Sequence, residues 1–152
     1  MQRYEFELFA DYHQFYLQDE AADADVSFES WSDEAIENGA VLMPGKIFVQ
    51  TVRNMDVPVI IEVQDSAPDN NFDEWDKVFE CSIDIPSGKI VIAGCTDEWD
   101  EADRIEVVPG VYRARIYHGD LDTLNDDGLD GDDHYKVILW PAAPQAEAMR
   151  LK

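Results

Sequence analysis

The sequence predicts a mainly β protein, an antiparallel β-sandwich of about eight strands with one short helix. Apolar residues recur at a period of two, as in strands that bury one face, and charged loops or turn residues separate these runs. Hydrophobic residues make up 45% of the 152 residues, which is enough for a buried core. Because no repeat or linker interrupts the chain, we expect a single acidic β-sandwich domain over residues 1–152.

The strand-like runs begin at the start of the chain. In the first, Tyr4, Phe6 and Leu8 alternate with glutamates, and a bend at Asp11 separates this run from the second. The predicted strands are residues 4–8, 12–17, 46–52, 57–63, 77–85, 89–93, 110–117 and 135–140.

A short helix is predicted over residues 32–38. Ser32 is a favourable N-cap, and Asp33 and Glu34 place negative charge at the positive end of the helix. Gly39 can adopt the positive φ that commonly follows the last helical residue. This helix has about two turns, so we expect the strands to form most of the fold.

Two links between consecutive strands have turn-like sequences. Residues 53–56 have hairpin length, so we expect the strands before and after them to pair. Pro86-Ser87-Gly88 predicts a turn between the next two strands, because proline presets one φ and glycine supplies a positive one.

The charge balance is the unusual feature of the composition: 34 acidic residues stand against 11 basic ones, a net charge of −23. Self-repulsion makes such an excess costly, and halophilic solvation, calcium or a basic partner surface would each explain it. The negative net charge argues against direct binding of nucleic acids and against attachment to anionic membranes. With no signal-peptide pattern and no long apolar stretch, we expect a cytoplasmic protein.

The acidic residues form four clusters that lie between predicted strands. Because a sandwich gathers its loops at two ends, these clusters can merge into one or two negative surfaces. The alternative for each cluster is a loop that is simply solvated. The clusters occupy residues 18–39, 65–76, 97–103 and 120–133.

The second and third clusters each place a tryptophan, Trp75 and Trp99, among carboxylates. An exposed tryptophan beside carboxylates is a common composition for a protein-binding hot spot that faces arginines, whereas packing at the rim of the core is the alternative. The predicted partner-binding residues are Asp73, Glu74, Trp75, Asp97, Glu98, Trp99, Asp100 and Glu101.

The fourth cluster resembles a calcium loop, because Asp- and Asn-rich glycine turns supply the oxygen ligands that hard cations bind. Its spacing departs from that of an EF-hand, and a solvated hairpin loop is the alternative. Calcium is the one cofactor that the sequence suggests. Its predicted ligands are Asp120, Asp122, Asp126 and Asp130.

No catalytic motif is present: the sequence has no Gly-rich phosphate loop, no Gly-x-Ser-x-Gly elbow and no Cys-x-x-Cys pair. His118 and His134 flank the fourth acidic cluster and can face each other at the base of a hairpin, where a metal site is conceivable. The alternative is that each is a polar neighbour at a strand end. An enzyme is therefore not indicated.

Two segments resemble a known family. Tyr12-His13-Gln14-Phe15, followed by the run from Trp31 to Gly39 (WSDEAIENG), is similar in order and approximate spacing to the N-terminal pattern of competence protein J, a nuclease inhibitor of transformable bacilli. The acidic loop 120–133 is not part of that pattern, and proteins of one fold can carry different functions.

The resemblance implies an intracellular protein that inhibits a nuclease by binding it. Combined with the charge, this leads to the hypothesis of a non-enzymatic binding protein whose acidic loop surface engages a basic protein partner. The alternative hypothesis is a calcium-binding β-sandwich module that uses loop 120–133. The sequence leaves the partner and the oligomeric state open.

Overall fold

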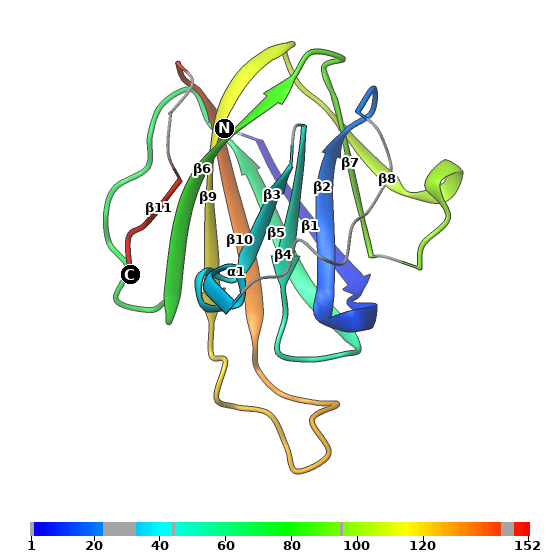
Figure 1. Cartoon of the computed structure of the whole chain (residues 1–152), viewed down its shortest axis with the longest axis vertical. Helices are drawn as coiled ribbons and strands as arrows, with labels where there is room; N and C mark the ends of the chain where they lie inside the picture. The colour runs from blue at the N-terminus through cyan, green and yellow to red at the C-terminus, as the bar shows by residue number, and fades with distance from the viewer. Residues whose placement is uncertain (1, 23–32, 44, 95, 144–147) are drawn as a thin grey trace.

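The computed structural model describes residues 2–22, 33–43, 45–94, 96–143 and 148–152, which form two β-sheets packed face to face (Figure 1). Sheet A has the order β1 (Gln2–Phe9), β5 (Asp56–Val63), β10 (His134–Pro141), β9 (Gly110–Gly119), β6 (Lys77–Ile85) and β11 (Met149–Arg150). Sheet B has the order β3 (Ala40–Met43), β4 (Lys46–Gln50), β2 (Gln14–Asp19), β7 (Lys89–Gly94) and β8 (Asp103–Glu106). The predicted mainly β fold is confirmed.

The strands pair antiparallel except for β10 and β5, which run parallel. The short helix α1 (Asp33–Asn38) precedes β3, and among the described residues the 3-10 turns η1 (Asp11–His13) and η3 (Trp99–Glu101) lie in connections between strands. No helix within the described residues is long and apolar enough to cross a lipid bilayer.

The core lies between the inner faces of the sheets, as the alternating pattern predicts. Leu8 belongs to the buried core cluster, and Tyr4 and Phe6 pack against it from the same face of β1. The rings of Phe15 on β2 and Tyr135 on β10 meet edge to face, with centroids 6.0 Å apart. Burial of such apolar surface is the main favourable term in folding.

Three strands were not predicted. β8 carries charged side chains at Asp103, Arg104 and Glu106, so its four residues lack the apolar alternation of a strand. β3 is a short apolar run, and β11 has only two residues. The prediction that Tyr12 and His13 belong to a strand was wrong, because they form η1 and β2 begins at Gln14.

The predicted pairing across residues 53–56 was also wrong. This link carries the chain from β4 in sheet B to β5 in sheet A, and the turn at Pro86–Gly88 likewise joins β6 in sheet A to β7 in sheet B. Gly88 has the expected positive φ of 73°. A short link therefore fits a crossing between packed sheets as well as a hairpin.

A buried ion pair connects the β4–β5 link to the base of the β9–β10 loop. Arg53 Nε lies 3.0 Å from Asp133 Oδ1, and the side chain of Asp133 is 0% exposed. The Tyr135 hydroxyl donates to Asp133 Oδ2 (2.8 Å) and accepts from the backbone N–H of Val52 (2.9 Å). Because a buried carboxylate without a positive partner destabilises the fold, Arg53 is needed to keep Asp133 buried.

Replacing Arg53 tests this role. We expect Arg53→Met to lower the free energy of unfolding by about 3 to 5 kcal/mol, because it leaves the buried charge of Asp133 uncompensated. The matched control is Arg3→Met, which removes an exposed ion pair with Glu5 and should cost less than about 1 kcal/mol. Urea unfolding of both variants measures the difference, and equal losses would contradict the role given to Arg53.

His118 is a second buried polar group on the inner face of sheet A. Its Nε2 lies 3.0 Å from the carbonyl oxygen of Gln50, and since a carbonyl only accepts, Nε2 carries the proton. Burial, with the positive charge of Lys77 nearby, lowers the pKa of His118 from 6.5 to about 4. The imidazole is therefore neutral in the folded protein at neutral pH.

This depressed pKa predicts a specific pH dependence. Between pH 6.5 and 4 the unfolded chain binds a proton at His118 that the folded chain does not bind, so stability falls as the pH decreases through that window. His118→Gln should flatten this part of the curve of unfolding free energy against pH. A slope for His118→Gln equal to that of the wild-type protein would contradict the prediction.

Candidate functional site

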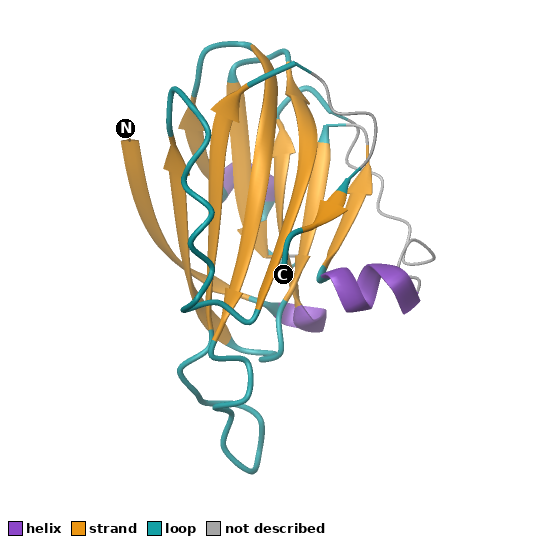
Figure 2. Cartoon of the chain, turned by 90° about the vertical axis from the view of Figure 1, so that its left-hand side faces the viewer, coloured by secondary structure: helices purple, strands orange, loops and turns teal. Residues whose placement is uncertain are grey.

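Strand direction brings most of the acidic connections to one end of the sandwich, which we call the acidic end. Strand β1 ends there, and strands β5, β6, β8 and β10 begin there. The same end therefore contains η1, α1 and the connecting residues 51–55, 72–76, 96–102 and 120–133. The β9–β10 loop extends beyond the sheets (Figures 1 and 2). Parts of all four acidic clusters therefore share one end, and Asp19 and Glu20 of the first cluster lie at the other.

A cleft of about 330 Å³ opens at one flank of the acidic end, between β1 of sheet A and the β7–β8 connection of sheet B. Its apolar lining comes from Leu8, Phe9, Ile92 and Ala102. Six acidic residues surround these apolar ones: Glu7, Asp56, Asp97, Glu98, Glu101 and Asp103. We call this site the acidic cleft.

None of the six acidic residues of this cleft forms an ion pair with a basic side chain among the described residues. Arg104, the base nearest in sequence, instead pairs with Glu20 (Nε to Oε2, 2.7 Å). Asp97 is held by the backbone N–H of Gly94, which donates to its Oδ2 at 2.8 Å. Like charges repel one another even in water, so the carboxylates of the cleft favour an incoming cation.

The predicted partner-binding residues fall into two groups on opposite flanks of the acidic end (Figure 1). Asp97, Glu98 and Glu101 line the acidic cleft, and Asp100 is an exposed neighbour within η3. Asp73, Glu74 and Trp75 lie beside β6 on the far side of sheet A. The structure therefore does not join the two groups into one patch.

Neither predicted tryptophan is fully exposed. Trp99 packs against the outer apolar face of sheet B, and the Arg104 guanidinium carbon lies 5.4 Å from its ring centroid. Trp75 packs against Tyr117 and His134, with ring centroids 5.1 and 5.0 Å apart. Both half-buried rings thus anchor their loops by packing, which is the alternative given from the sequence, and their contact with a partner stays a prediction.

Arg115 holds the loop that carries the second cluster. Its Nη1 donates to the carbonyl of Asp69 (3.0 Å) and to Asn70 Oδ1 (3.1 Å), while its Nη2 pairs with Glu80 at 2.9 Å. The loop then reaches the acidic end, where Asp76 Oδ2 accepts from the backbone N–H of Leu121 (2.8 Å). These contacts fix residues 69–76 against sheet A.

The proposed calcium ligands do not come together. Within the described residues, which include Asp120, Asp122, Asp126 and Asp130, no group of three or more His, Cys, Asp or Glu side chains could hold a metal ion. Asp130 instead lies 3.6 Å from Arg53 and accepts from the backbone N–H of Gly131. Calcium binding by this loop stays a prediction without a coordination geometry in the structure.

Thermal unfolding tests the calcium hypothesis directly. A native-state calcium site would raise the unfolding midpoint with calcium and lower it again with a chelator. From the dispersed carboxylates we expect a small rise that magnesium at the same concentration reproduces, because either cation screens the negative charge. A large rise specific to calcium would contradict this expectation and restore the calcium module.

The proposed pairing of His118 and His134 was wrong. His118 lies opposite Tyr135 and His134 opposite Gly119, so the two histidines are one position out of register and point to different faces of sheet A. His118 is buried against Tyr135, and His134 stacks on Trp75. They do not form a metal site.

Sequence reasoning missed two acidic residues of the cleft. Glu7 lies within a strand and Asp56 begins the next strand of the same sheet, so neither belongs to an acidic cluster. Their alternation with apolar residues indicates exposure, but it does not indicate what lies opposite. The cleft arises because β7 and β8 of the other sheet bring Asp97 and Asp103 to the same place.

Comparison with known proteins agrees with this fold. A search of curated proteins found no match. ComJ from Bacillus subtilis, described as an inhibitor of the DNA degrading activity of NucA, has a TM-score of 0.72 at 19% identity, covering 93% of this chain and 98% of that one. The protein of crocagin biosynthetic gene J has a TM-score of 0.60 at 20% identity, covering 94% and 100%.

The sequence model of the family Competence protein J (ComJ) matches residues 7–139. This span includes both sheets, apart from the first residues of β1, the end of β10 and β11, and it includes the acidic cleft. The chain therefore belongs to the competence protein J family.

Proposed function

We propose that this protein is a non-enzymatic binding protein that inhibits a nuclease by presenting the acidic cleft to its basic surface. The observation that carries the proposal is the cleft itself, where six acidic residues converge without a basic partner among the described residues. Membership of a family in which ComJ inhibits NucA supports a nuclease as the partner. The cytoplasm is the proposed location.

The proposed mechanism is competition for the nuclease surface that binds DNA. A nuclease holds phosphates with a positively charged cleft, and a protein surface that carries carboxylates at fixed positions occupies the same place. Complementary charge speeds association and makes binding sensitive to salt. The protein itself performs no chemistry in this mechanism.

Inhibition of DNA degradation tests the proposal. We expect the purified protein to slow degradation by B. subtilis NucA, or by an extract of the cells that produce this protein, with at least about a ten-fold loss of inhibition between low salt and 0.3 M salt. The triple variant Glu7→Gln, Glu98→Gln, Glu101→Gln should weaken inhibition and flatten its salt dependence. The absence of inhibition at low salt in both assays would contradict the proposal.

A matched triple variant controls for net charge. Asp65→Asn, Asp84→Asn and Glu106→Gln remove the same number of charges from exposed positions at the other end of the sandwich. If the acidic cleft contacts the partner, this control keeps most of the inhibition. Equal losses in the two triple variants would indicate a general effect of net charge and contradict the assignment of the cleft.

A further inference from the structure

Three exposed apolar side chains lie beside the acidic cleft. Phe9 is 37% exposed, Tyr12 is 64% exposed and Met55 is 37% exposed. Phe9 also lines the cleft, and the backbone N–H of Ala10 donates to the carbonyl of Met55 at 3.0 Å, so the segments that carry the three residues are joined. We call these three residues the apolar rim.

The backbone at Tyr12 adopts a conformation that is costly for a large side chain. Tyr12 has φ 60° and ψ 24°, and His13 follows with φ 59°, so two consecutive residues other than glycine lie in the left-handed region. Such conformations persist only where the surrounding structure imposes them, and they are concentrated at functional sites.

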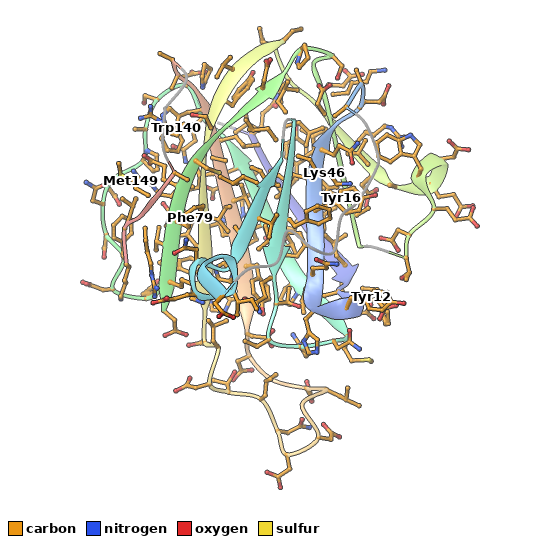
Figure 3. The ribbon with its side chains drawn as sticks, in the orientation of Figure 1. Tyr12, Tyr16, Lys46, Phe79, Trp140 and Met149 are labelled. Atoms are coloured by element: carbon orange, nitrogen blue, oxygen red, sulfur yellow. The ribbon has the colours of Figure 1, made fainter. Side chains whose placement is uncertain are left out.

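The surrounding structure holds this turn from both sides. Asp11 Oδ1 accepts from the backbone N–H of Tyr12 (3.0 Å), and Asn54 Oδ1 accepts from that of His13 (3.3 Å). The backbone N–H of Thr51 donates to the carbonyl of His13 at 2.8 Å. Tyr12 thus lies on a fixed turn at the margin of the molecule (Figure 3).

Burial of the side chain does not explain why Tyr12 adopts this costly backbone conformation. The conformation leaves the side chain 64% exposed, whereas every residue of β2, which begins two positions later at Gln14, is buried. A tyrosine on a fixed backbone loses little backbone freedom on binding, and tyrosine is enriched among interface hot spots. The turn therefore presents Tyr12 in a form suited to binding.

We infer that the apolar rim is a docking surface for an arginine- or lysine-rich face of a partner protein, with Tyr12 as its anchor. Charge complementarity identifies this occupant: Glu7, Asp11 and Asp56 lie on the same segments as the rim, and cations bind the faces of aromatic rings. A second copy of this chain would bring a second acidic end to the contact and repel it. The inference deepens the proposed function and rests on it.

Substitutions of Tyr12 test the inference through inhibition of NucA, or of the cell extract if wild type inhibits that alone. We expect Tyr12→Asn to weaken inhibition about ten-fold or more, while the unfolding midpoint stays equal or rises, because asparagine tolerates the left-handed region better. Tyr12→Phe keeps the ring and should stay within about three-fold of wild type. The loss of inhibition in Tyr12→Asn should persist at high salt, unlike the loss of inhibition in the triple variant of Glu7, Glu98 and Glu101.

A charged pair of variants tests the chemistry of the partner. Tyr12→Lys should inhibit about ten-fold less well than Tyr12→Glu at low salt, because the two variants share the loss of the ring and differ in the sign of the charge. Val108→Asn is the control for loss of an exposed apolar side chain, since Val108 is 76% exposed at the other end of the sandwich. It should inhibit as wild type does.

Several outcomes would overturn the inference. Wild-type inhibition by Tyr12→Asn, or a loss of inhibition accompanied by a lower unfolding midpoint, would show that Tyr12 is not an anchor. Equal inhibition by the Lys and Glu variants would exclude a basic partner face at the rim. If only the triple carboxylate variant loses inhibition, the apolar rim is excluded as a docking surface and the proposed function stands. A wild-type protein without inhibitory activity would contradict both the proposed function and the role of the rim.

Discussion

The shortage of basic residues is the constraint on which the structure depends, because 11 bases cannot neutralise 34 acids. The fold places several of its bases at carboxylates with little access to water. Arg53 pairs with Asp133, Arg115 with Glu80 and Lys136 with Glu62, and these three acidic side chains are 0%, 8% and 6% exposed. A desolvated carboxylate costs several kcal/mol without a partner, whereas an exposed one is stabilised by water.

The same distribution holds the acidic loops in place. Arg53 joins the β4–β5 link to Asp133 and Asp130, at the base of the β9–β10 loop, and Arg115 fixes the loop before β6 against sheet A. The bases thus stabilise the supports of the acidic end and, in the part of the chain that the structure describes, form no ion pair in the acidic cleft. A partner that supplies cations there meets carboxylates held by a rigid scaffold, which reduces the entropic cost of binding.

Two unfavourable features meet at this end of the sandwich: mutual repulsion among carboxylates, and the left-handed backbone at Tyr12 and His13. Both are sustained by the well-packed core and by the hydrogen bonds of the turn to Thr51 and Asn54. Natural proteins commonly retain such local costs where binding or catalysis takes place, at the expense of stability. The coincidence of the two features supports the acidic end as the functional surface.

The sequence by itself determined the fold class, the inward faces of strands such as β1, and the acidic character of the loops, because periodicity and composition are local properties. It did not reveal β8, whose charged residues become a strand only by pairing with β7, or the left-handed turn at Tyr12. Tertiary structure alone decided that residues 53–56 cross between sheets and that Glu7 and Asp56 face Asp97 across a cleft. These features depend on which distant segments meet, and a local pattern carries no information about its distant neighbours.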